Sequence, residues 1–296
     1  MGVPGDASAG DPSLSPGAAG LFGPDSVTWR IMGEPVIWVA GLRSLYLQAL
    51  NPRAMRAIWQ NSGFADRGEA WGRFVRTAEF VRVRTYGTAA EADRAGRRIR
   101  KIHGTLTGTD ADGSTIRLDE PELLLWVHCG EVSSYLEIVR RCGMQLSAAD
   151  LDNFVAEQQR SAALVGLDAL AVPASVAALG RYYQQVRPGL SACAEARQAL
   201  RGSFNPPVPA QYAALRLIVP PLGALAFATL PRWARKLYGT PGSPLTDIAA
   251  TAALRAIYQS TTHVPRQVLY FPATAASRLR GRGRDRDVPA APASAA

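Results

Sequence analysis

Residues 119–128 read DEPELLLWVH, and this stretch decides the fold that the sequence predicts. Three of its first four residues are acidic, and acidic side chains favour a helix N-terminus because they face the positive end of the helix dipole. The following run from Leu123 to Val127 is apolar on all sides, which is typical of a helix buried on every side. This helix is expected to end near Gly143. The sequence therefore predicts a helix in this region that is buried on every side.

Segments before and after this run also favour helices. Thr88 with Glu91, and Ser147 with Asp150, have the three-residue spacing of helix caps. The alternating β-branched runs that mark strands are almost absent, and residues 107–115 are expected to be a polar loop. We therefore expect a single all-α, multi-helix bundle with about nine helices. Besides this buried helix, they cover 35–50, 52–61, 67–85, 88–105, 147–166, 191–202 and 243–262, with one more opened by Pro173.

The helical domain is expected to cover residues 25–280. Residues 1–24 and 281–296 are rich in Gly, Pro, Ala and Ser, which predicts a disordered leader and a disordered tail. The leader has neither the basic start nor the apolar core of a signal peptide. The three cysteines form no CxxC pair, which disfavours a zinc site, a c-type haem attachment and a disulfide framework. The sequence thus favours a reducing compartment and a cytoplasmic location.

The basic charge of the chain does not indicate nucleic-acid binding. The formal net charge is +9, but its 33 Lys and Arg residues include only two lysines, Lys101 and Lys236. Arginines are spread along the whole chain, whereas nucleic-acid-binding proteins usually gather them on one face or tail. We therefore expect no nucleic-acid partner.

Residues 217–231, LIVPPLGALAFATLP, are apolar enough to require a membrane test. A membrane-spanning helix needs about 20 apolar residues, and this stretch is shorter and contains Pro220-Pro221. A buried or re-entrant segment is the simpler interpretation. A peripheral, interfacial membrane contact is the alternative, and the sequence leaves it open.

The helix expected at 67–85 carries a basic side opposite its apolar stripe. A solvated basic face is the common explanation of such a pattern. The other explanation is a guanidinium cluster that binds carboxylates or phosphates through paired hydrogen bonds. The sector concerned contains Arg73, Arg76, Thr77, Phe80 and Arg84.

The sequence has only three histidines, so each can be considered in turn as a metal ligand or a structural residue. His103 lies at the border of the apolar stripe of the 88–105 helix, where a histidine is usually structural, but a haem iron needs only one such imidazole. His128 lies inside the apolar helix after Leu124 and Leu125, as a core histidine or a second ligand. His263 is expected to cap the carbonyls at a helix end.

The sequence also lacks the motifs of several other enzyme classes. These are zinc proteases, serine hydrolases, dinucleotide-binding proteins, P-loop nucleotidases and carboxylate-bridged di-iron bundles.

Several segments, in their order, resemble one known family. They include RFVRT (73–77), YGT (86–88), IHG (102–104) and DEPELLLWVH (119–128), and the resemblance extends over about residues 28–240. The series is similar to the catalytic domain shared by bacterial rubber oxygenases (latex-clearing proteins) and MpaB-type oxygenases of mycophenolic acid biosynthesis. No single motif is specific, but the order and spacing together are.

The resemblance implies a globin-like all-α fold that encloses a non-covalent haem b. It makes His103 the axial iron ligand and places Arg73, Arg76 and Thr77 at the haem pocket, with Arg76 and Thr77 as catalytic candidates. Rubber oxygenases have Lys at the position of Arg76; an arginine stays charged and cannot ligate iron, so it is expected to bind a propionate or oxygen. His128 matches a WVH segment of MpaB-like members and is a supporting residue or the ligand instead.

Two departures from the family bear on the reaction. Asn51 stands where many MpaB-like members carry His before Pro, and no clear counterpart of the distal carboxylate of rubber oxygenases is found among Asp66, Glu69 and Glu79. The resemblance therefore predicts a haem b-dependent oxygenase that acts with dioxygen on a small hydrophobic metabolite, without fixing the reaction. A non-enzymatic helical protein that binds haem or lipid is the alternative, and a basic helical adaptor without a cofactor is a third hypothesis.

Overall fold

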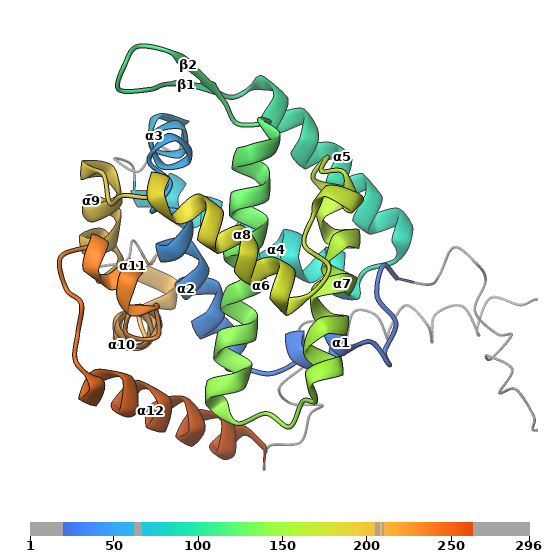
Figure 1. Cartoon of the computed structure of the whole chain (residues 1–296), viewed down its shortest axis with the longest axis vertical. Helices are drawn as coiled ribbons and strands as arrows, with labels where there is room; N and C mark the ends of the chain where they lie inside the picture. The colour runs from blue at the N-terminus through green and yellow to red at the C-terminus, as the bar shows by residue number, and fades with distance from the viewer. Residues whose placement is uncertain (1–19, 62–66, 205–207, 209, 263–296) are drawn as a thin grey trace, which may run out of the picture.

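The computed structural model describes residues 20–61, 67–204, 208 and 210–262. Over these residues the chain forms twelve α-helices, three short 3-10 helices and one two-stranded sheet. The prediction of an all-α single domain is confirmed (Figure 1).

Helix α6 (Pro121–Cys142) is the buried helix that the apolar run predicts, and it lies at the centre of the molecule (Figure 1). Glu120 is its N-cap, and Gly143 ends it with a φ of 84°, in the left-handed region that a glycine adopts without steric cost. Trp126 and Ile138 are among its fully buried residues, while Val127 is only partly buried. Burial on nearly every side follows because other helices cover α6 along its length.

Helix α2 (Ile37–Gln48) is the main partner of α6. The Trp126 indole Nε1 donates a hydrogen bond to the Gln48 carbonyl over 2.8 Å, and the Gln48 amide Nε2 donates to the Val127 carbonyl over 3.0 Å. The buried Arg43 of α2 donates to the Ser134 hydroxyl over 2.7 Å. These bonds satisfy polar groups that would otherwise be buried without partners in the seam between the two helices.

The remaining helices surround this pair. Both predicted caps are confirmed, because Thr88 with Glu91 and Ser147 with Asp150 form reciprocal capping boxes at the starts of α5 and α7. The bounds are α1 (Val27–Met32), α3 (Pro52–Asn61), α4 (Arg67–Tyr86), α5 (Ala89–Thr105), α7 (Ala148–Leu164), α8 (Val176–Val186), α9 (Ala194–Ser203), α10 (Leu215–Ala228), α11 (Arg232–Leu237) and α12 (Pro244–Thr262).

Three expectations about local structure are wrong. The segment expected to be a polar loop contains a hairpin of β1 (Thr107–Thr109) and β2 (Thr115–Arg117). The Ile116 side chain of β2 is fully buried, which fixes the hairpin against the domain. The helix expected at Pro173 begins at Val176, since the Ser175 hydroxyl accepts from the Ala178 N–H and caps it there. The helix count exceeds nine because α1 and α11 have six residues each, too few to show a period, and because α10 forms where a buried or re-entrant segment was favoured.

The described residues begin at Gly20, inside the stretch assigned to the leader. Phe22, inside the stretch assigned to the leader, is 1% exposed, and Gly20 forms a bridge with Thr88. The packed domain therefore includes residues before position 25. The rest of the expected leader, the whole expected tail and His263 lie outside the described residues.

Residues 217–231 lie largely in α10, which is continuous through Pro220 and Pro221. Gly223 and Ala226 are buried, whereas Leu217 and Ile218 are exposed near the start of the helix. The segment is thus a surface helix with one buried side. None of the helices in the described ranges has the length and hydropathy needed to cross a membrane.

Candidate functional site

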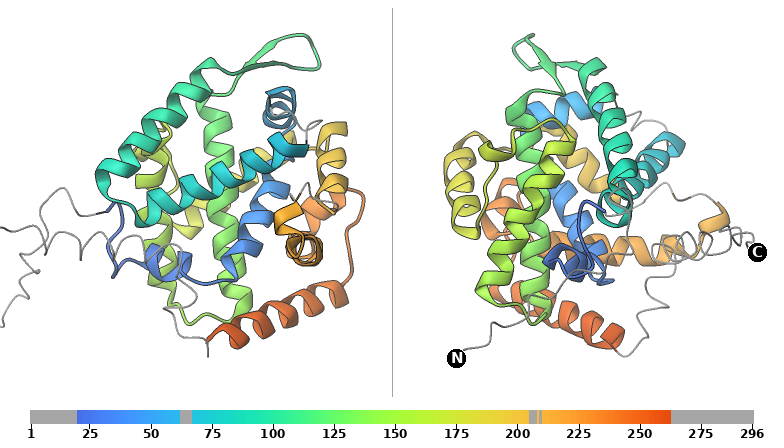
Figure 2. Two further views of the ribbon diagram at one scale, coloured as in Figure 1. Left: turned by 180° about the vertical axis from the view of Figure 1, so that it is seen from behind. Right: turned by 90° about the vertical axis from the view of Figure 1, so that its right-hand side faces the viewer.

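Helices α4 and α5 form a helical hairpin joined at Gly87 and Thr88, and together they carry four of the five predicted site residues (Figure 2). Gly87 belongs in this turn because a Cβ there would lie 2.5 Å from the Val83 carbonyl oxygen. The capping box then starts α5 immediately, so α4 and α5 pack against each other. This hairpin brings the RFVRT and IHG segments onto neighbouring helices.

His103 is a partly buried residue near the end of α5. Its Nδ1 atom is buried and has no hydrogen-bond partner among the described residues. Burial lowers the pKa of the imidazole, and the nearby charge of Arg73 lowers it further, against the opposite effect of Asp119. A neutral imidazole with an unsatisfied buried nitrogen is the state in which histidine binds a metal.

Arg73 is the residue that the structure brings close to His103 from the other helix. Burial lowers the pKa of its guanidinium, and the neighbouring charge of Arg76 adds to this effect. An arginine stays charged in spite of such a shift. The pair therefore places a cation beside a neutral imidazole, although 30 positions separate the two residues in the sequence.

Arg76 and Thr77 are exposed on α4. The Thr77 hydroxyl donates to the Arg73 carbonyl over 3.0 Å. The guanidinium of Arg76 lies back over Gly72, where an added Cβ would be 3.1 Å from its Nη1. Both side chains thus lie close to Arg73 along one helix.

Arg84, at the other end of the predicted basic sector, is buried. Its side chain pairs with Glu131 of α6 over 2.5 Å, and the Tyr135 hydroxyl donates to the same Glu131 oxygen over 2.7 Å. Burial alone would raise the pKa of Glu131, but Arg84 and Tyr135 hold it below the usual value. The solvated-face interpretation is wrong for Arg84, because this part of α4 faces the central helix.

His128 belongs to the surroundings of this buried ion pair. It is 6% exposed and lies one turn before Glu131 on α6. Its charged neighbours are Glu131 and Arg84, whereas those of His103 are Arg73 and Asp119. Arg73 and Arg84 are about 16 Å apart along α4 at 1.5 Å per residue. The two histidines therefore lie in different electrostatic environments.

The protonation of His128 leads to a prediction about acid stability. Burial lowers its pKa from 6.5 to about 4, an effect that Glu131 opposes and Arg84 reinforces. Between these pH values the unfolded chain binds a proton that the folded chain does not, so stability falls as the pH falls. As the pH is lowered from 6.5 to 4, His128 should therefore reduce the free energy of unfolding by about 3 kcal/mol.

Urea unfolding of wild type and His128→Gln at several pH values measures this contribution. The stability difference between the two proteins should change by about 3 kcal/mol in favour of the variant as the pH is lowered. A difference that stays constant across this range would contradict the prediction.

Glu131 is the residue that sequence reasoning missed. A carboxylate within an apolar helix, one turn after a buried histidine, was the available signal. Of the acids considered earlier, Glu79 is exposed and pairs with Arg82. Asp66 lies outside the described residues, as does the side chain of Glu69.

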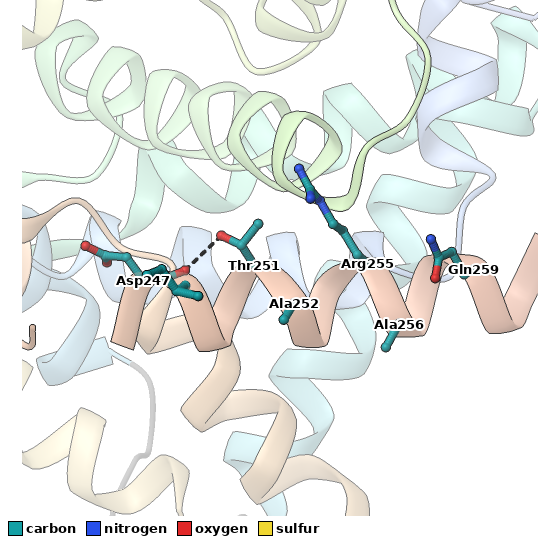
Figure 3. Close-up of a pocket in the computed structure, with 7 residues that line it drawn as sticks. Asp247, Thr251, Ala252, Arg255, Ala256 and Gln259 are labelled. Atoms are coloured by element: carbon teal, nitrogen blue, oxygen red, sulfur yellow. Dashed lines mark hydrogen bonds between the residues drawn. The ribbon is translucent and has the colours of Figure 1, made fainter. Parts of the chain in front are cut away.

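Other chemistry finds little support in the described part of the chain. Burial raises the pKa of the Cys129 thiol to about 12, so it is no thiolate nucleophile. No group of three or more His, Cys, Asp or Glu residues within the described ranges is arranged to hold a metal ion. A shallow hollow on α12 is lined only by that helix, between Asp247 and Gln259, and contains none of the predicted residues (Figure 3).

Comparison with family models identifies a family for this chain. The family model described as "ER-bound oxygenase mpaB/B'/Rubber oxygenase, catalytic domain" matches residues 29–260. No curated protein and no solved structure matches the chain. The matched range contains the α4–α5 hairpin and the whole of α6. This chain therefore belongs to the mpaB/rubber oxygenase catalytic-domain family.

Proposed function

We propose that this protein is a haem b-dependent oxygenase that acts with dioxygen on a small hydrophobic metabolite, with His103 as the axial ligand. Its family is one of oxygenase catalytic domains, which supports an oxidoreductase in general. The observation that carries the finer proposal is the buried Nδ1 of His103, which lacks a partner among the described residues and lies in an imidazole kept neutral by burial. Such a ring fits an iron ligand.

The residues around His103 also fit a haem. A haem carries two propionate carboxylates, and Arg73 is a cation positioned near the imidazole. Arginine binds carboxylates through paired hydrogen bonds, so Arg73 and Arg76 would hold the propionates. Ile99 and Leu106 of the same region are partly buried and would supply apolar contacts. Bound haem would supply the activation of dioxygen, which no side chain provides by itself.

The chain would contribute binding, orientation and polarity. His103 would hold the group through one nitrogen of an imidazole that burial, together with the nearby Arg73 charge, keeps unprotonated. Thr77 has a hydroxyl that donates to the Arg73 carbonyl, and on rotation it could donate to a bound reactant instead. Arg76 keeps its charge and cannot replace a ligating lysine. We therefore propose Arg76 and Thr77 as the polar residues next to the reacting groups, and His128 as a supporting residue.

The visible spectrum of the purified protein tests this proposal. After expression with added iron and haem precursor, we expect a Soret band and about one haem per chain. Oxygen consumption with a panel of apolar compounds then separates an oxygenase from a protein that only binds haem or lipid. A chain that stays free of haem under these conditions would favour the cofactor-free adaptor and contradict the proposal.

A further inference from the structure

Large apolar side chains are exposed together on one face of the molecule. Trp38 is 58% exposed on α2 and Leu217 is 81% exposed on α10, and α2 and α10 pack against each other. Leu45 lies two turns after Trp38, on the same side of α2. We call this surface the apolar face; it comprises Trp38, Leu45, Val75, Tyr212, Leu217 and Ile218.

Aromatic contacts make the apolar face continuous across three elements. The Trp38 ring lies 6.4 Å from Phe74, and the Phe74 ring lies 5.8 Å from Trp71. The Trp71 ring in turn lies 6.1 Å from Tyr212, which ends a 3-10 helix just before α10. In the left view of Figure 2, α4 crosses this side of the molecule and α10 is seen end-on beside it. The exposed residues therefore form one patch.

The apolar face is distinct from the proposed haem side of α4. Trp71 and Val75 are four residues apart and share one side of the helix, and Arg73 and Thr77 share another side for the same reason. These two sides are separated by about half a turn, at 100° per residue. A haem beside Arg73 and His103 would thus leave the apolar face uncovered.

The charge around the α2 and α10 part of the apolar face is of one sign, while on α4 the exposed Glu79, one turn after Val75, is paired with Arg82. The sequence has no Asp or Glu in residues 35–65 or 196–246, the ranges that contain α2, most of α9 and all of α10. The second range contains several cations, of which Arg197, Arg201 and Arg216 are exposed. Exposed apolar and aromatic side chains, with surrounding arginines that outnumber the carboxylates, are the pattern of a surface that binds anionic lipid.

We propose that the apolar face docks on the surface of an anionic lipid bilayer. Trp38, Leu217 and Ile218 enter the boundary between headgroups and acyl chains, and the arginines of α9 and α10 bind lipid phosphates. A second copy of the chain is a poorer occupant. A twofold interface would bring the same cationic surface against itself, and like charges across an interface oppose association.

Vesicle binding by the purified full-length chain tests the proposal. We expect co-sedimentation with vesicles of phosphatidylcholine mixed with phosphatidylglycerol, little with phosphatidylcholine alone, and weaker binding at high salt. Leu217→Glu combined with Ile218→Glu should lower the partition coefficient at least about tenfold, because both burial and charge attraction are lost. Arg197→Gln combined with Arg201→Gln should reduce the dependence on phosphatidylglycerol.

The matched control is Leu170→Glu. Leu170 is 92% exposed in the 3-10 helix Ala169–Ala171, away from the apolar face, so this variant should bind vesicles as wild type does. Circular dichroism verifies that all variants are folded. The proposal fails if the wild-type protein does not bind anionic vesicles. It also fails if Leu170→Glu weakens binding as much as Leu217→Glu combined with Ile218→Glu.

Self-association is the third outcome to measure. If sedimentation shows a dimer that the double Glu variant dissociates, without vesicle binding by wild type, the apolar face is a contact between two copies and the proposal is overturned. Haem content does not enter any of these measurements. A failure here is therefore distinguishable from a failure of the proposed oxygenase function.

Discussion

His103→Ala should lose its haem. We expect the haem content to fall from about one per chain to less than roughly a tenth, since removing even an outer-shell partner of a metal ligand costs 10–100-fold in affinity. His103 is the histidine of the described residues whose ring nitrogen is buried without a partner, and it has Arg73 beside it. The Soret absorbance per chain, measured after gel filtration, gives the occupancy.

His128→Ala is the matched variant for this experiment. His128 is more deeply buried than His103 and is placed near Arg84 and Glu131 rather than near Arg73. Its replacement should leave the haem content close to that of wild type, although the fold loses stability. The opposite result, with haem kept in His103→Ala and lost in His128→Ala, would make His128 the ligand. Added imidazole should restore a haem spectrum to His103→Ala if only the ligand is missing.

The parts of the fold that could be predicted are those encoded by neighbouring residues. The run Leu123–Val127 predicted a helix buried on almost every side, and α6 is that helix. The pairs Thr88 with Glu91 and Ser147 with Asp150 predicted two helix starts, because a capping box joins residues only three positions apart. The hairpin at 107–117 was missed because its strands have three residues each and no extended alternation.

The candidate site could be predicted only in part, because distant residues decide it. Helical spacing placed Arg73, Arg76 and Arg84 in one sector, but the environment of each depends on what α4 crosses. Arg84 meets Glu131, 47 positions further on, and is buried, whereas Arg76 stays exposed. The proximity of His103 to Arg73 likewise follows from the turn at Gly87. Family resemblance selected these residues, and the packing of α4 and α5 supplied their surroundings.

Arg84→Met should destabilise the protein by about 3–5 kcal/mol, since it leaves the Glu131 carboxylate buried without its cation. Arg84 is 5% exposed and bonds to Glu131 over 2.5 Å, so little water reaches the pair. Glu131→Gln should lower the free energy of unfolding by a similar amount, because it leaves the Arg84 guanidinium buried without its carboxylate. Tyr135→Phe removes a single hydrogen bond to Glu131 and should cost about 1 kcal/mol.

The double variant Arg84→Met/Glu131→Gln distinguishes a buried charge pair from ordinary packing. With both charges gone, no unpaired ion remains, and the double variant should be more stable than either single one. Arg97→Met is the matched control, because Arg97 pairs with Asp93 on the exposed side of α5 and such surface pairs contribute at most about 1 kcal/mol. Equal losses in Arg84→Met and Arg97→Met, measured by urea unfolding at neutral pH, would refute the argument. If the double variant is more stable than either single variant and Arg97→Met loses least, the Arg84–Glu131 ion pair is a contact that fixes α4 against α6. The same helix α4 places Arg73 beside His103.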